Sequence, residues 1–276
     1  MSYNFGRSVT QQSRGAHSAT VIFLHGLGDT GNGWAPVGQQ LNIPHVKFIF
    51  PTAPTRPVSL NGGMPMPAWF DLAQLDQLLK GEQDGPGVAA SIAHIEGLVQ
   101  QEVAAGIPAD RIVVGGFSQG GHVALKLLLG TKQRLAGCIA CSTWLEFAAN
   151  SSTQQKVQPS AASLRIPVFI GHGTLDQLIP SNMANNSEQT LQRLGYSSVK
   201  RRMYSGMQHA SCPEELGDIR RFILDAVPDT PPPSKSSTEI DDMSVKELRQ
   251  YLTSRGVSTT GMLEKGEYVS AARALL

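Results

Sequence analysis

Short apolar segments and helix-like spacings of apolar residues alternate along most of this chain. Six segments predict β-strands, and all but the last of them are short, largely apolar runs that are typical of buried strands. They cover residues 19–24, 46–50, 112–117, 136–141, 167–171 and 199–204. Helical patterns cover residues 89–104, 181–194 and 214–226, and Ser181 is placed to cap the second of them. This alternation predicts an α/β fold, in which a mostly parallel sheet is covered by helices on both faces.

Two stretches interrupt the alternation. Residues 51–79 contain five prolines together with Trp69 and Phe70, and we expect Pro51 to end the strand that precedes them. Residues 150–163 are polar and rich in Ser and Gln, which is typical of a surface loop.

The composition changes at Asp229. The next residues are mostly Pro and Ser, which is typical of a semi-rigid, solvated linker. Beyond it, Ser244 and Glu247 have the spacing of a helix capping box, and Gly256 ends the apolar pattern that follows. Residues 264–276 predict a second short helix. We therefore expect an α/β domain over residues 1–228, a linker over 229–239 and a helical hairpin over 240–276.

Charge and cysteine content narrow the function classes. The formal net charge is +1, which gives no electrostatic indication of nucleic acid or of an acidic membrane surface as a partner. The chain has no run of 18 apolar residues, and its polar N-terminus lacks the pattern of a secretory signal. Three cysteines are too few for a disulfide framework and fit a reducing compartment. We expect a cytoplasmic protein that meets membranes only transiently.

The sequence Gly116-Phe117-Ser118-Gln119-Gly120 lies between a predicted strand and a helical pattern. A G-x-S-x-G motif in this context is typical of the nucleophile elbow of α/β-hydrolases, where a sharp turn exposes the serine. A chain with 28 glycines can contain the motif by chance, so a Gly-rich turn after a buried strand is the alternative. Residues elsewhere in the chain are needed to distinguish a nucleophile elbow from a Gly-rich turn.

A serine nucleophile needs a base, and the base needs an acid that holds its tautomer. In α/β-hydrolases these groups follow the serine in the order acid, then histidine, each after a strand. Asp176 follows the predicted strand 167–171, and His209 follows the predicted strand 199–204. The order and the placement therefore predict a catalytic triad of Ser118, Asp176 and His209.

The tetrahedral intermediate of such a reaction needs two hydrogen-bond donors where negative charge develops. One is the backbone N–H of the residue after the nucleophile, here Gln119, and the other comes from the loop after an early strand. That loop is His25-Gly26-Leu27-Gly28-Asp29, and we expect the Leu27 N–H to be the second donor. The alternative is an ordinary strand-to-helix turn.

We expect structural rather than chemical roles for the remaining histidines and cysteines. We expect His172 to order the loop of the acid, and His122 to point away from the serine. Cys138 and Cys141 have C-x-x-C spacing but lie within a predicted strand, where residues three apart face opposite sides. Because no grouping of His, Cys and Asp has metal-ligand spacing, we expect neither a metal nor a cofactor. Surface or packing roles are expected for His17, His45, His94 and His122.

Several of these stretches resemble a known family. The sequences over residues 21–31, 115–121, 142–145 and 206–212, and those over 51–58 and 66–71, are similar to acyl-protein thioesterases. These are lysophospholipase and carboxylesterase relatives within the α/β-hydrolases. The resemblance covers residues 18–228.

The resemblance implies the same triad of Ser118, Asp176 and His209, with Leu27 and Gln119 at the oxyanion hole. It implies removal of fatty acyl chains from S-acylated cysteines of proteins, with lysophospholipids and small esters as further substrates. The Pro-rich stretch then becomes the wall of an acyl-chain channel, for which plain core packing is the alternative. Our candidates for that wall are Leu72, Leu75, Trp144 and Leu178.

The chain departs from the family at both ends. Some members carry an S-acylated cysteine after the initiator Met, where this chain has Ser2. The C-terminal hairpin is an addition that resembles a SAP motif, and some SAP motifs bind DNA. Residues 240–276 hold five basic and five acidic residues, so the basic surface of a nucleic-acid binder is missing and a protein partner is favoured.

Two other functions remain open from the sequence. A carboxylesterase or lysophospholipase would use the same triad, because oxygen esters and thioesters are cleaved by the same groups. A non-catalytic binding module on the same fold is less consistent with a complete triad.

Overall fold

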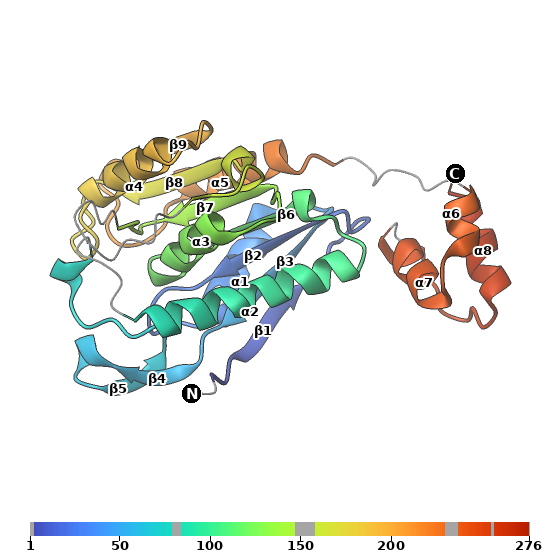
Figure 1. The fold of residues 1–276 in the computed structure, drawn as a ribbon, viewed down its shortest axis with the longest axis horizontal. Helices are drawn as coiled ribbons and strands as arrows, with labels where there is room; N and C mark the ends of the chain where they lie inside the picture. Colours follow the sequence, from blue (N-terminus) through green and yellow to red (C-terminus); the bar gives the residue numbers. More distant parts are fainter. Residues whose placement is uncertain (1–2, 79–83, 147–157, 230–236, 255–256, 276) are drawn as a thin grey trace.

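A computed structural model describes residues 3–78, 84–146, 158–229, 237–254 and 257–275 (Figure 1). Its centre is a seven-stranded sheet of order β1-β3-β2-β6-β7-β8-β9, in which all neighbours are parallel except β1 and β3. The predicted α/β architecture is therefore confirmed. The strands are β1 (Gly6–Gln11), β2 (Ala19–Leu24), β3 (Val46–Thr52), β6 (Ile112–Phe117), β7 (Gly137–Cys141), β8 (Val168–Gly173) and β9 (Val199–Tyr204).

Helices cover both faces of the sheet, and each face has its own apolar core (Figure 1). Helices α2 (Gly85–Ala104), α3 (Gln119–Gly130) and α4 (Asn182–Arg193) pack on one face. Helices α1 (Gly31–Leu41) and α5 (Pro213–Ala226) pack on the other. As the strand periodicity predicts, Cys138 belongs to the first core and Cys141 to the second.

Some element boundaries differ from the sequence-based expectation. Strand β3 continues through Pro51 to Thr52, because Pro51 falls at an irregularity in the pairing with β1 and its missing N–H interrupts no regular pair. Strand β1 has no apolar run because it is a partly exposed edge strand. Helix α1 escapes sequence reasoning because it holds three glycines and Pro36. Ser181 does occupy the N-cap of α4, but its side chain makes no capping hydrogen bond.

The Pro-rich stretch forms a small hairpin of β4 (Thr55–Val58) and β5 (Met64–Pro67), joined through the short 3-10 helix η1 (Ser59–Asn61). After the hairpin, Trp69, Phe70 and Leu72 enter the core beside α2 and α3. A second 3-10 turn, η2 (Leu75–Gln77), follows. Most of the surface loop predicted over 150–163 lies outside the described residues; the described part leads into the 3-10 helix η4 (Ser163–Arg165).

The C-terminal segment forms three short helices, α6 (Ser237–Asp242), α7 (Val245–Ser254) and α8 (Lys265–Arg273). The predicted capping box is present, since the Ser244 N–H donates to Glu247 Oε2 at 2.7 Å and the Glu247 N–H donates to Ser244 Oγ at 3.3 Å. Helix α6, which the sequence analysis did not predict, begins within the segment expected to be linker. Gly256 lies outside the described residues. The helices share a small apolar core of Ile240, Leu248, Tyr251, Leu252, Tyr268 and Ala272.

Within the described part of the chain, no helix is both long enough and apolar enough to cross a membrane.

Candidate active site

Ser118 occupies the sharp turn between β6 and α3, with φ 53° and ψ −120°. Such a positive φ is uncommon for a residue other than glycine and marks backbone strain. The flanking glycines make the turn possible. A Cβ on Gly116 would lie 2.4 Å from the carbonyl carbon of Gly120, and a Cβ on Gly120 would lie 2.5 Å from the carbonyl oxygen of His25. The backbone thus has the geometry that the G-x-S-x-G motif predicts.

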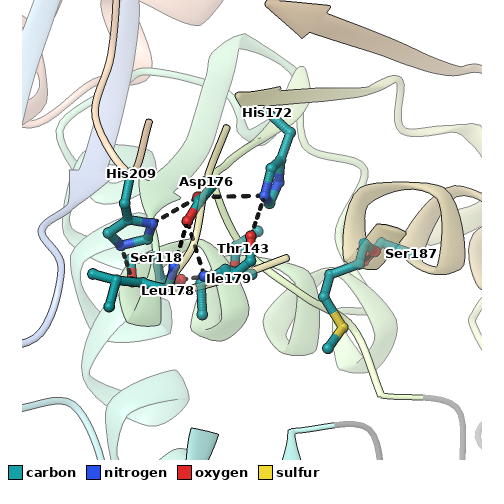
Figure 2. A network of polar contacts seen from close by, with 9 residues as sticks. Ser118, Thr143, His172, Asp176, Leu178, Ile179, Ser187 and His209 are labelled. Atoms are coloured by element: carbon teal, nitrogen blue, oxygen red, sulfur yellow. Dashed lines mark hydrogen bonds and ion pairs between the residues drawn. The ribbon is translucent and has the colours of Figure 1, made fainter. Parts of the chain in front are cut away.

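The ends of three parallel strands bring the predicted triad together. Ser118 follows β6, Asp176 follows β8 and His209 follows β9. His209 Nε2 lies 3.0 Å from Ser118 Oγ, and His209 Nδ1 lies 2.8 Å from Asp176 Oδ2 (Figure 2). Because an ionised carboxylate only accepts hydrogen bonds, Nδ1 carries the proton and Nε2 is left to accept the Ser118 hydroxyl. The three side chains form one continuous hydrogen-bonded chain.

Asp176 is held by donors on both of its oxygens (Figure 2). Oδ1 accepts the backbone N–H groups of Leu178 at 3.0 Å and Ile179 at 2.9 Å. Oδ2 faces His209 and also His172 Nε2, which is 3.4 Å away. Burial alone would raise the pKa of Asp176, but hydrogen bonds from His172, His209 and the Ile179 N–H outweigh it and lower the pKa below its usual range. The carboxyl is therefore ionised at neutral pH.

His172 supports the acid loop, as the sequence analysis expects. Its Nε2 donates to the Ile179 carbonyl oxygen at 2.8 Å, which fixes the tautomer with the proton on Nε2. The same N–H edge faces Asp176, so His172 ties both ends of the turn that carries the acid.

The two predicted oxyanion donors come from different elements. Leu27 follows β2, Gln119 begins α3, and both line the cavity that contains Ser118. Gln119 N–H belongs to the first turn of the helix, where unsatisfied N–H groups and the helix dipole favour negative charge. His25 precedes Leu27 and accepts the Ala53 N–H on Nε2, so its Nδ1 donates to the Gly26 oxygen. Burial lowers the pKa of His25, which keeps the ring neutral.

A cavity of about 410 Å³ opens beside these groups and also reaches Ser118 and His209. Its size is within the range of small-molecule sites. All four residues predicted for the channel wall line it: Leu72, Leu75, Trp144 and Leu178. Trp144 is buried, whereas Leu178 is 53% exposed and lies toward solvent. Sequence reasoning missed Leu60 and Asn61, which line the cavity from η1, because nothing in the Pro-rich stretch predicted that turn.

The other histidines have packing roles. His122 lies beneath the cavity wall, where its Nδ1 is 3.2 Å from the Trp144 oxygen and its ring stacks on Trp144. His94 stacks on Phe5, and His45 Nε2 lies 2.8 Å from the Val227 oxygen. His17 contacts Thr20 and Glu102 within the fold, and burial lowers the pKa of its imidazole to about 4.

Comparison with known proteins gives a family whose description agrees with a hydrolase site of this geometry. The phospholipase/carboxylesterase family model matches residues 6–226, a span that ends before α6. Acyl-protein thioesterase 1 of Cryptococcus neoformans is 44% identical over 227 residues, covering 77% of this chain and 94% of the relative. Acyl-protein thioesterase 1 of Neurospora crassa is 39% identical over 231 residues, covering 81% of this chain and 93% of the relative.

Solved structures give the same result. Acyl-protein thioesterase 2 of Zea mays superposes with a TM-score of 0.70 at 32% identity, covering 80% of this chain and 99% of that one. Arabidopsis thaliana SOBER1 superposes with a TM-score of 0.69 at 27% identity, covering 76% of this chain and 99% of that one. With its fold, its motifs and these relatives in agreement, the chain belongs to the phospholipase/carboxylesterase family of α/β-hydrolases and is a serine hydrolase related to the acyl-protein thioesterases.

Proposed function

We propose that this serine hydrolase releases fatty acyl chains from S-acylated cysteines of proteins, with Ser118, His209 and Asp176 as its catalytic triad. The observation that carries the proposal is the hydrogen-bonded chain from Ser118 to Asp176 at the edge of a largely apolar cavity. The relatives named acyl-protein thioesterase support the choice of substrate.

The first half-reaction forms an acyl-enzyme. Ser118 Oγ attacks the thioester carbonyl carbon while His209 Nε2 accepts the hydroxyl proton. Asp176 keeps His209 in the tautomer that can accept it and stabilises the imidazolium that results. The N–H groups of Leu27 and Gln119 hold the oxygen on which negative charge develops. When the intermediate collapses, the carbon–sulfur bond breaks, and the departing sulfur takes the proton from His209 and leaves as a thiol.

The second half-reaction releases the fatty acid. His209 Nε2 accepts a proton from water, and the oxygen of that water attacks the ester carbonyl carbon on Ser118. The same two N–H groups stabilise the second oxyanion. The bond to Ser118 Oγ then breaks, His209 returns the proton to Oγ, and the free enzyme is restored.

The apolar cavity is the proposed site of the acyl chain. Leu72, Leu75, Trp144 and Leu178 supply apolar surface beside the nucleophile. Each methylene group moved from water to such a surface gains about 0.8 kcal/mol, so a chain of several carbons would contribute substantially to binding. The substrate protein itself would stay outside the cavity.

Oxygen esters of lipids are the second candidate substrates. The matched family is described as phospholipase and carboxylesterase, and a serine triad cleaves both bond types. Specificity constants for an S-palmitoyl peptide, lysophosphatidylcholine and a short p-nitrophenyl ester would rank the substrates. A higher constant for either oxygen ester than for the thioester peptide would overturn the choice of acylated protein.

Labelling of the nucleophile tests the mechanism. A fluorophosphonate probe should label Ser118 in the native enzyme, and the Ser118→Ala variant should neither be labelled nor hydrolyse S-palmitoyl peptide. If the alanine variant retains both properties, the assignment of Ser118 is wrong. A folded native enzyme that is inert to the probe would indicate a binding module on the same fold.

The cytoplasm is the proposed location of the enzyme. We also propose that helices α6–α8 bind a protein partner. The support for a protein partner is charge pairing within the segment, where Arg273 contacts Asp241, Lys265 donates to the Asp241 oxygen, and the balance of charges is neutral over residues 240–276. A neutral balance favours a protein over nucleic acid, which requires a basic surface.

A further inference from the structure

Trp69 connects the two halves of the proposed oxyanion hole. Its indole Nε1–H donates to the carbonyl oxygen of His25, two residues before Leu27, at 2.9 Å. Its backbone N–H donates to the side-chain oxygen of Gln119, also at 2.9 Å. The Gln119 amide then donates back to the Phe70 oxygen at 2.8 Å. One residue thus holds the loop after β2 and the first residue of α3 by separate hydrogen bonds.

These contacts are fully enclosed. Trp69 and His25 are each 0% exposed, and Gln119 is 1% exposed. The Trp69 ring packs on the His25 ring with centroids 5.0 Å apart, and Ser91 Oγ on α2 donates to the Trp69 oxygen at 2.5 Å. Away from water, a donor or acceptor that loses its partner cannot replace it, so each of these groups is restricted to one arrangement.

A second contact joins the same segment to the same loop. The Gly28 N–H donates to the oxygen of Pro67, two residues before Trp69, at 2.8 Å. Leu27 lies between His25 and Gly28, so the loop is tied to this segment on both sides of the proposed donor. The segment 67–70 therefore acts as a brace between the loop of Leu27 and the start of α3.

From this geometry we infer that Trp69 is a positioning residue that sets the distance and orientation between the two oxyanion donors. The inference rests on the function proposed above. Oxyanion donors stabilise a transition state only when they are fixed where the negative charge forms, and loss of one such donor typically lowers kcat by about 10²–10³-fold. A donor that is displaced rather than lost still stabilises the transition state in part, so the fall in kcat is smaller.

Two substitutions separate positioning from packing. Trp69→Phe keeps an aromatic ring but removes the indole donor to His25. Gln119→Met removes the side-chain amide but leaves the backbone N–H of residue 119 in the chain. On a short p-nitrophenyl ester, which makes little use of the acyl cavity, each variant should lower kcat by about 10- to 100-fold, less than the loss of a whole donor. KM should stay within about threefold, because ground-state binding is not disturbed.

Inhibition constants distinguish a positioning role of Trp69 from a packing role. An alkyl boronic acid forms a tetrahedral adduct with the nucleophile and places an oxygen at the oxyanion hole. Its inhibition constant should rise by the factor by which kcat/KM falls, whereas that of the product fatty acid should stay unchanged. The double variant should lose less than the product of the two single losses, since both side chains act through one brace.

Tyr196→Phe is the matched control. It removes one buried hydroxyl that contacts Ser163 and the Leu128 oxygen, neither of which belongs to a residue lining the cavity, and Tyr196 is 2% exposed. It should lower the melting temperature but leave kcat within about twofold of the native value.

Three results would overturn the inference: a kcat within twofold of native in folded Trp69→Phe and Gln119→Met, equal weakening of the fatty acid and the boronic acid, or an equal loss of kcat in Tyr196→Phe. If Trp69→Phe does not fold, Gln119→Met decides. Failure of the proposed function would appear separately, as full activity in Ser118→Ala.

Discussion

At the scale of single residues, the surroundings of Asp176 suit a catalytic role. Two backbone N–H groups and His172 hold the carboxylate in place independently of His209. Asp176→Asn should therefore keep the fold, but an amide N–H facing His209 favours the wrong tautomer. We expect kcat to fall by roughly three to four orders of magnitude with the melting temperature little changed. Steady-state kinetics on a short ester would measure the change in kcat. A loss of kcat below tenfold would contradict the role of Asp176 in orienting His209.

A second carboxyl, Glu215, has an unusual environment that the mechanism does not use. It is fully buried in the first turn of α5, next to Gly171 and the Cys141 thiol. Burial raises the pKa of Glu215 to about 8, and the nearby Asp218 charge adds to the effect. The folded chain thus holds a proton that the unfolded chain releases above its ordinary pKa of about 4.3. The stability that this proton contributes is complete below the unfolded pKa of about 4.3 and is lost progressively as pH rises from there to about 8.

Glu215→Gln should mimic the protonated carboxyl at every pH. Relative to the native chain, its melting temperature should be similar at about pH 4 and higher at about pH 8.5, with a gain in unfolding free energy on the order of a few kcal/mol. Thermal unfolding followed by circular dichroism at both pH values would measure the difference. Glu96→Gln, on the exposed face of α2, is the control and should show no such trend. A pH-independent difference for Glu215→Gln would contradict the shifted pKa.

At the scale of elements, the nucleophile elbow depends on the contact between α3 and the end of β2. A Cβ on residue 120 would lie 2.5 Å from the carbonyl oxygens of both Leu24 and His25, which are backbone atoms that cannot move aside cheaply. Gly120→Ala should therefore push α3 away from the loop of Leu27, lower the melting temperature and reduce kcat by at least tenfold, since one displaced oxyanion donor is enough for such a loss.

Gly217→Ala is the matched control for Gly120→Ala. Gly217 lies on α5, and nothing is within 4 Å of the Cβ that alanine would add. In a helix this change should stabilise the chain by about 0.5–1 kcal/mol without changing kcat. If both variants behave alike in thermal melts and in kinetics, the close contact at Gly120 does not matter.

Elements with local signals were predictable from the sequence, and those that depend on distant partners were not. Five of the six predicted strands are compact apolar runs, and the elbow has glycines at positions that its own backbone requires, so Ser118, Asp176 and His209 could be placed in order. Strand β1 and the hairpin of β4 and β5 gave no such signal, because polar edge strands and prolines resemble loops. The brace at Trp69 could not be predicted either, because its two hydrogen bonds join residues 50 and 44 positions apart in the sequence.

At the scale of the whole molecule, the three C-terminal helices share an apolar core that, among the described residues, is drawn from residues 240–275. The family match ends at residue 226, and Arg111 donates to the Pro228 oxygen at 2.8 Å, so the hydrolase fold holds its own last residues. A chain shortened to residues 1–229 should therefore keep the melting temperature of the main transition and its kcat/KM on a short ester. A clearly lower melting temperature, or a loss of kcat/KM above about threefold, would show that α6–α8 belong to the catalytic unit.

The central claim is that Ser118 carries the acyl group of a protein thioester during turnover. The most direct measurement is acid quenching of the enzyme a few milliseconds after mixing with an S-palmitoyl peptide, followed by peptide mass mapping. We predict a palmitoyl group on the peptide that contains Ser118, appearing together with the free thiol and disappearing as fatty acid is released. Thioester cleavage that proceeds with no acyl group on Ser118 at any time would contradict the account.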